Sequence, residues 1–132
     1  MQVSLTKINR ATDGSTDVTF VSDVGGADAK WGGAYPVTSR SYLVELSLNE
    51  DLIWGQNIVP DEFCSHSIEQ EGSKIVIKGM LEMYDLYDDG TVTIRVGDAI
   101  IVEETTGSPP QAGSHICVCV DKNNLVLYDY EV

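Results

Sequence analysis

The stretch from Lys74 to Val96, KIVIKGMLEMYDLYDDGTVTIRV, decides the fold class of this chain. Apolar residues occupy every second position on both sides of its centre, which is the period of a strand with one buried face. Between the two runs, Asp88-Asp89-Gly90 supplies residues that tolerate positive φ, as tight turns require. The stretch therefore predicts a β-hairpin, with Gly79 as a bulge or a point of close approach. Its expected inward-facing residues are Ile75, Ile77, Gly79, Leu81, Met83, Val92, Ile94 and Val96.

The same two-residue period recurs along the chain, whereas no long window keeps a helical period. Further strands are expected over residues 3–8, 17–21, 42–48, 99–103, 114–121 and 125–131. The first strand is expected to place Val3, Leu5 and Lys7 on one face, and the last two to form a hairpin. These features predict one all-β domain over residues 1–132, a small antiparallel β-barrel or β-sandwich of about eight strands. Its expected core includes Tyr42, Val44, Leu46, Ile75, Ile77, Leu81, Val92, Ile94, Ile116 and Val118.

Three stretches rich in Gly, Pro or polar residues interrupt this pattern. Residues 23–35, 50–63 and 105–113 are expected to be irregular, with room for one helical turn in the second. Large aromatic side chains in the first two are expected mainly to cap open ends of the core. These aromatic residues are Trp31, Tyr35, Trp54 and Phe63.

Charge excludes several classes of function. Eight Lys and Arg residues against 21 Asp and Glu residues give a net charge of −13 in 132 residues. Such a balance disfavours binding to nucleic acid and to anionic membrane surfaces. No apolar run approaches the ~20 residues that a membrane helix needs, and no export signal is visible. With three cysteines, an odd number, the chain is expected in the cytoplasm.

All Cys and His residues fall in two short patches, Cys64–His66 and His115–Cys119. If both patches are extended and adjacent, Cys64, His66, His115, Cys117 and Cys119 could converge on zinc. Neighbouring ligands on one strand face lie nearly 7 Å apart, which is too far for one ion without a bend. A Cys–His catalytic pair is disfavoured because nearby carboxylates stabilise the thiol. The sequence therefore predicts no metal and no cofactor.

Carboxylates occur as neighbouring pairs, Glu50-Asp51, Asp61-Glu62, Asp88-Asp89 and Glu103-Glu104, each beside a predicted turn or at a strand end. Carboxylates in such places are usually solvated, whereas acid–base catalysis needs a buried one. Asp85–Gly90 lacks the ligand spacing of a calcium loop, and Gly25-Gly26 and Gly32-Gly33 lack the Lys-Ser/Thr of a phosphate loop. No catalytic set is recognisable, so the chain reads more as a binding protein than as an enzyme.

We therefore expect a non-catalytic module that binds a basic protein, by physical analogy with immunity-type inhibitors of nuclease-like toxins. The alternatives are a small hydrolase-type enzyme and a structural subunit of a homo-oligomer, paired through an edge strand. The candidate binding residues are Asp85, Tyr87, Asp88, Asp89, Glu103 and Glu104, with Tyr84 or Tyr87 as an anchor.

Overall fold

The computed structural model describes residues 1–85 and 90–129. The protein is all-β: its described residues form twelve strands in one continuous sheet and one short 3-10 helix. The strands are β1 (Gln2–Arg10), β2 (Thr16–Ser22), β3 (Gly25–Gly32), β4 (Ser41–Leu48), β5 (Leu52–Ile53), β6 (Ile58–Pro60), β7 (Ser67–Glu71), β8 (Lys74–Asp85), β9 (Thr91–Val96), β10 (Ala99–Thr106), β11 (His115–Asp121) and β12 (Leu125–Asp129); the helix is η1 (Lys122–Asn124). No helix in the described ranges is both long and apolar enough to cross a membrane.

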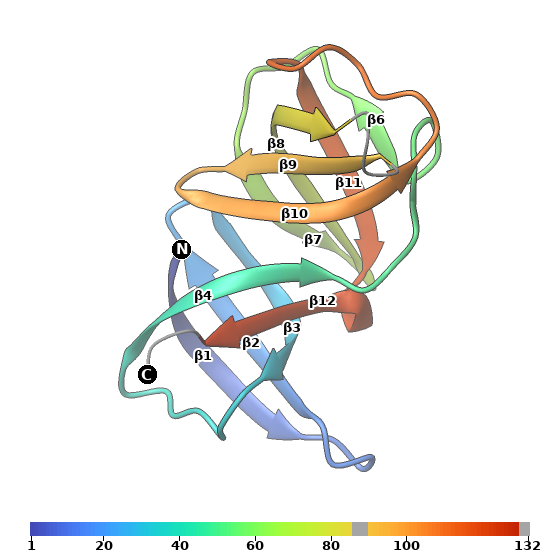
Figure 1. Ribbon diagram of the computed structural model, residues 1–132. Coiled ribbons are helices and arrows are strands. Elements are labelled where there is room, and N and C mark those ends of the chain that lie inside the picture. The colour runs from blue at the N-terminus through green and yellow to red at the C-terminus, as the bar shows by residue number, and fades with distance from the viewer. Residues whose placement is uncertain (86–89, 130–132) are drawn as a thin grey trace.

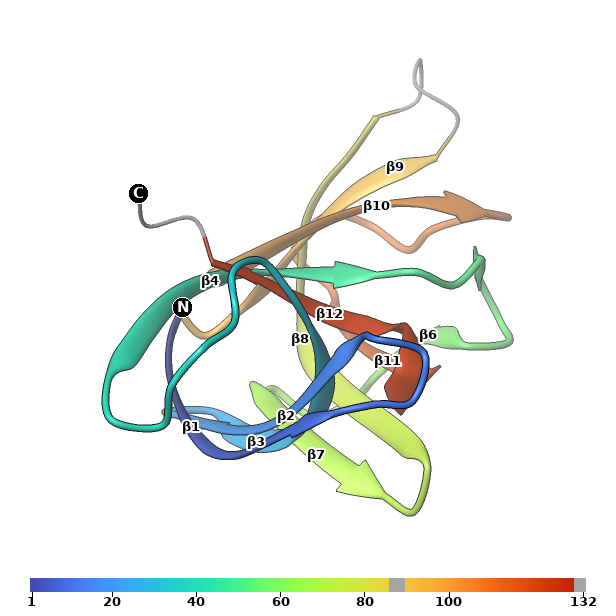
Figure 2. The ribbon, with the colours of Figure 1, turned by 90° about the horizontal axis from the view of Figure 1, so that it is seen from below.

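Five of these strands close into a barrel. In order around it they are β1, β2, β3, β12 and β4, and every neighbouring pair is antiparallel except β3 and β12. Figure 2 shows β1, β2 and β3 on one side of this barrel, with β4 and β12 on the other. Strand β12 follows residues 49–124 in the chain, so closure of the barrel joins segments that are far apart in the sequence.

The remaining strands form a second curved layer, the upper half of Figure 1. The long strand β8 pairs with β7 and then β9 along one edge and with β11 along the other. Beyond them, β9 pairs with β10 and β11 pairs with β6. A bridge between Trp54 and Ile58 joins the ends at β5 and β6, and the pair Gly25–Ile68 connects this layer to the barrel.

The core confirms the expected alternation. All ten residues predicted for it are buried, and they belong to one cluster of buried residues that extends through both layers. The hairpin of β8 and β9 is also confirmed, although its turn, residues 86–89, lies outside the described part of the chain. Gly79 marks a close approach, since a Cβ atom there would lie 2.3 Å from the carbonyl oxygen of Arg95.

Two β-bulges correct the predicted faces. In β1 the register shifts between Leu5 and Lys7, so Lys7 is exposed and Ile8 packs against the core. In β8 it shifts between Leu81 and Met83, so Met83 is 63% exposed. One extra residue reverses the side of every residue after it, and a two-residue pattern contains no sign of that insertion.

The structure has twelve strands where about eight were expected. The predicted loop 23–35 contains β3, in which Ala27, Ala29 and Trp31 are buried in alternation with polar residues. The glycines and alanines of this segment do not produce a recognisable apolar alternation, so the sequence pattern does not indicate the strand. Trp31 packs edge-to-face on Tyr42, with ring centroids 4.9 Å apart. Residues 50–63 contain the short strands β5 and β6 and no helical turn.

The predicted terminal hairpin is wrong. Strand β11 pairs with β8 and β6, whereas β12 pairs with β4 and β3, so the two strands belong to different layers. Between them η1 turns the chain, and the side chain of Asp121 accepts a hydrogen bond from the backbone N–H of Asn123 at its start. The sequence predicts a tight turn at these asparagines, whereas in the structure they belong to η1, where the chain crosses from one layer to the other. Strand β10 also runs on to Thr106, into the predicted loop 105–113.

Candidate functional site: an acidic groove between β4 and β10

A long groove lies where the barrel meets the second layer, between β4 and β10, which run beside one another in Figures 1 and 2. It consists of two hollows of about 520 and 680 Å³, which adjoin because Val102 and Glu103 line both. We call the pair the β4–β10 groove. Its apolar surface includes the exposed side chains of Ile100, Val102 and Tyr128.

Carboxylates line the groove along its length. They belong to Glu45, Glu50, Asp51, Asp98, Glu103 and Glu104, and no described lining residue is Lys, Arg or His. Met1 also lines the groove, and its amino group donates a hydrogen bond to the carbonyl oxygen of Val44 (3.3 Å). Side chains of one charge that share a concave surface create a local potential that attracts the opposite charge.

Glu103 links the two walls of the groove. Its Oε1 accepts a hydrogen bond from the backbone N–H of Leu48 (2.8 Å) and a longer one from the Ser47 hydroxyl (3.5 Å). Burial raises the pKa of Glu103, and the Leu48 and Ser47 bonds offset that effect only in part. The Glu103 carboxylate therefore connects β10 to β4 through hydrogen bonds.

The Glu50 carboxylate, just after β4, makes a second connection of this kind. Its Oε1 accepts hydrogen bonds from the Asp121 N–H and the Asn124 side chain, both 3.0 Å, and its Oε2 accepts one from Asn57 (3.1 Å). Burial alone would raise the pKa of Glu50, but these bonds outweigh burial and lower it. Glu50 therefore holds three chain segments together, while Glu45, Asp51, Asp98 and Glu104 are exposed.

The residues expected to bind a partner fall into three groups. Glu103 and Glu104 line the groove. Asp85 ends β8, where it pairs with Thr91, which in turn pairs with Glu104, so Asp85 and Glu104 lie two strands apart at one end of the sheet. Tyr87, Asp88 and Asp89 lie outside the described residues. Tyr84 packs against the core instead of standing free as an anchor.

The second wall of the groove escaped sequence reasoning. Glu45, Glu50 and Asp51 come from a segment distant in sequence from Glu103 and Glu104, whereas Asp98 directly precedes β10 and lies on the same wall as those two residues. A weak signal was present, since Glu45 occupies an outward position on a well-patterned strand. The signal did not show which strand would lie opposite, because that depends on closure of the barrel.

The Cys and His patches come together only in part. The rings of His66 and His115 lie 6.2 Å apart, whereas Cys64 is exposed and all three cysteines are free. Across residues 1–85 and 90–129, no three His, Cys, Asp or Glu side chains are placed to hold one metal ion. His66 Nδ1 accepts a hydrogen bond from Gly97 N–H (2.8 Å), and burial, followed by nearby Asp61, raises the pKa of the Cys117 thiol. A raised pKa works against a thiolate nucleophile.

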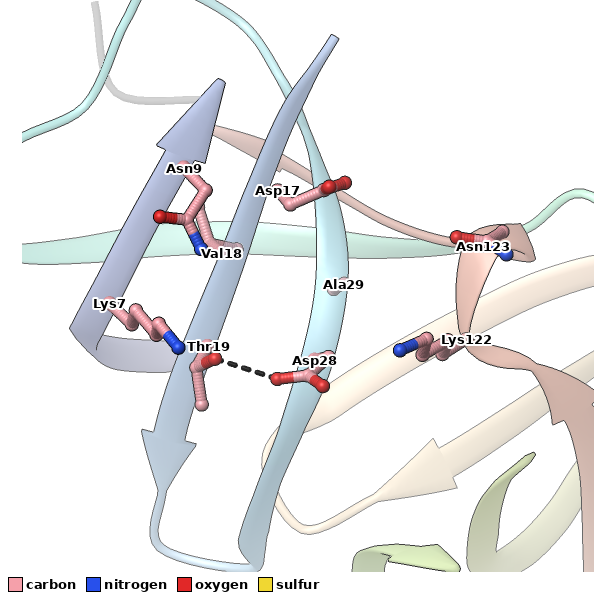
Figure 3. A pocket seen from close by; sticks show the side chains of 9 residues that line it. All are labelled: Lys7, Asn9, Asp17, Val18, Thr19, Asp28, Ala29, Lys122 and Asn123. Carbon is pink, nitrogen blue, oxygen red and sulfur yellow. Dashed lines mark hydrogen bonds between the residues drawn. The ribbon is translucent and has the colours of Figure 1, made fainter. Parts of the chain in front are cut away.

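A smaller polar pocket of about 220 Å³ lies on the outer face of β1, β2 and β3. In Figure 3 the amino groups of Lys7 and Lys122 approach the pair formed by Thr19 and Asp28 from opposite sides. The Thr19 hydroxyl donates to Asp28 Oδ1 (2.6 Å), which is the main cause of the lowered pKa of Asp28. Since both lysines also lower this pKa, the pocket is an internally compensated cluster of charges.

Comparison of the chain with protein families, with curated proteins and with solved structures finds no match.

Proposed function

We propose that this protein is a non-catalytic binding module whose β4–β10 groove receives a basic protein. One observation carries the proposal: six carboxylates line the groove, and its described lining contains no Lys, Arg or His. The carboxylates of the groove would attract a basic surface and repel other acidic proteins. Exposed apolar side chains within the same groove give such a partner area to bury.

The specific activity that we propose is inhibition of a basic, nuclease-like toxin, in the manner of an immunity protein. An inhibitor of this kind needs charge, shape and fast encounter, and it needs no catalytic group of its own. We place this activity in the cytoplasm, because all three cysteines are free thiols. The support is the distribution of charge on the groove, with the large negative charge of the whole chain.

The test starts from capture of a partner from native lysate, followed by association kinetics at low and high salt. We expect a basic partner whose association rate falls at least about tenfold as salt screens charges beyond ~8–10 Å. Asp98→Asn/Glu104→Gln should slow association, because these two exposed carboxylates line the groove. If the partner is a nuclease, an equimolar amount of the protein should abolish its activity.

The matched control is Lys7→Gln/Lys122→Gln, which removes two charges at the pocket on the outer face of the barrel. It should leave the association rate unchanged or slightly raised. A further variant, Asp88→Asn/Asp89→Asn, tests whether the carboxylates between β8 and β9 contribute to the association rate in addition to those of the groove. An acidic partner, or a rate indifferent to salt and to the groove substitutions, would overturn the proposed function.

A further inference from the structure

Strand β10 has one paired edge and one nearly free edge. It pairs with β9 from Ala99 to Glu104, whereas on its other side only Thr105 and Thr106 pair, with β5. Alternate residues of an antiparallel strand direct their N–H and C=O groups to the same edge. Thr105 N–H donates to Gly90 O on the β9 side, and Thr106 O accepts from Trp54 on the β5 side. The backbone groups of Ile100, Val102 and Glu104 therefore face the groove.

The opposite wall has the same property. Asn49 N–H donates to Asn124 O, which places the backbone groups of Ser47 and Glu45 on the β12 side. By alternation, Val44, Leu46 and Leu48 direct theirs toward β10. Val44 N–H donates to Met1 O and Leu48 N–H to Glu103 Oε1, so two of these donors already have acceptors. Within the described structure, Leu46 has no strand partner on this side.

Glu103 shows what the free edge of β4 can accept. Its carboxylate oxygen lies 2.8 Å from Leu48 N–H, the position that the carbonyl oxygen of an additional strand would occupy. A side chain thus substitutes for a strand at one end of the groove, while Ile100 and Val102 leave the middle of the β10 edge open. An exposed strand edge of this kind is a template for pairing with another chain.

Charge decides which chain can pair there. A second copy of β10, laid antiparallel, would bring its own Asp98 and Glu104 against the acidic rim, and like charges at a sheet edge repel. The charged side chains that a strand rich in Lys or Arg meets along the described lining are all carboxylates. The occupant that fits is therefore an extended, basic segment of a partner protein.

We infer that an extended basic segment of the partner docks in the β4–β10 groove as an added strand, paired with the backbone of Ile100–Glu104. The inference rests on the proposed function and specifies its mode of recognition. Backbone hydrogen bonds supply affinity, and alternate side chains of the segment meet the carboxylates. The free edge from Ile100 to Glu104 is about 17 Å long at ~3.3 Å per residue, so a segment of about six to eight residues suffices.

The probe is the peptide acetyl-Lys-Val-Lys-Val-Lys-Val-Lys-amide with two N-methylated forms, one methylated at every Val and the other at every Lys beyond the first. Each form removes three N–H donors from one edge and keeps all charges. We expect the unmethylated peptide to bind and one methylated form to bind about tenfold more weakly, because at least two hydrogen bonds are lost. Amide exchange at Ile100, Val102 and Glu104 should slow when the unmethylated peptide binds.

Val102→Pro tests the same bonds from the protein side. Proline removes the N–H that faces the groove and leaves the β9 ladder intact, which edge strands tolerate. Peptide binding should fall by about tenfold in Val102→Pro and stay near the parent value in Val102→Ala. Because the methylated peptides need no variant, a failure of Val102→Pro to fold still leaves a decisive measurement.

The outcomes separate the two proposals. If both methylated peptides bind as tightly as the unmethylated one, strand pairing is overturned while the proposed function stands. If a captured basic partner binds but no basic peptide does, strand pairing is again overturned. If the corresponding Glu-Val peptide binds as tightly as the Lys-Val peptide, charge recognition fails, and with it the proposed function.

Discussion

Replacing Glu50 by Gln should destabilise the fold through a single mismatched hydrogen bond. Gln retains one acceptor oxygen for Asp121 N–H and the Asn124 amide, but its own amide nitrogen then faces the Asn57 amide nitrogen. Asn57 cannot turn round, because its Oδ1 accepts the Ile53 N–H (2.7 Å) and its Nδ2 also donates to a backbone carbonyl (2.7 Å). One bond is therefore lost, and the two that remain lose their charge.

The expected cost is about 1–3 kcal/mol, since a hydrogen bond to a charged group is worth roughly 1.5–3 kcal/mol and Glu50 is partly exposed. For a domain of this size, that cost lowers the midpoint of thermal unfolding by roughly 5–10 °C. Urea unfolding at pH 7 measures the loss directly. Glu62→Gln is the matched control, because Glu62 is exposed, and its stability should stay within about 0.5 kcal/mol of the parent.

The pH dependence tests the mechanism. Because its hydrogen bonds hold the pKa of Glu50 below the ordinary value of 4.5, ionised Glu50 contributes stability above that pH, and the contribution is lost as the pH falls through the lowered pKa. The difference in unfolding free energy between parent and Glu50→Gln should therefore be largest near neutrality and narrow below pH 4.5. Equal stability at pH 7, or a difference that persists unchanged to pH 3, would refute the conclusion that the hydrogen bonds of ionised Glu50 stabilise the fold.

Two further predictions follow from burial. Glu103→Gln should change the unfolding free energy in the opposite direction. Burial raises the pKa of Glu103, so the parent loses stability as the pH rises above 4.5. In the same urea assay at pH 7, the variant should therefore be more stable than the parent, by less than about 1 kcal/mol. A clear loss at pH 7 would contradict this. Ile77→Ala should cost about 2–5 kcal/mol, whereas Met83→Ala, on the same strand but exposed, should cost less than about 0.5 kcal/mol. Similar losses at both positions would contradict the bulge in β8.

The sequence predicts the fold where burial of one strand face is the dominant force. Tyr42, Val44 and Leu46 alternate with polar residues because the interior takes one face of β4 and water takes the other. The pattern fails where something other than side-chain polarity sets the structure. Gly25–Gly32 forms a strand because small side chains permit close packing, and Lys122–Asn124 carries the chain between layers because long-range pairing decides where β12 goes.

The candidate site could be predicted only as separate acidic positions. Glu103 and Glu104 stand out as neighbouring charges at the end of a predicted strand, but adjacent residues of a strand point to opposite faces. The structure accordingly gives them different roles, with Glu103 bonded to Leu48 and Glu104 exposed at the rim. Their partners on β4 depend on which strand edges meet when the barrel closes, and hydrophobic periodicity says nothing about edges.

In β10, the alternate residues whose backbone groups face the open edge are also the ones whose side chains are exposed. Ile100 and Val102 direct their backbone groups into the groove and also expose their side chains, at 46% and 57%. An unpaired strand edge with exposed apolar side chains is an aggregation hazard unless something opposes self-pairing. Here the opposing element is charge, since Asp98 and Glu104 flank the open segment and line the groove with the carboxylates of β4. The negative charge of this chain therefore has a local consequence in the recognition mode that we infer: it disfavours pairing of this edge with a second copy and favours pairing with a basic strand.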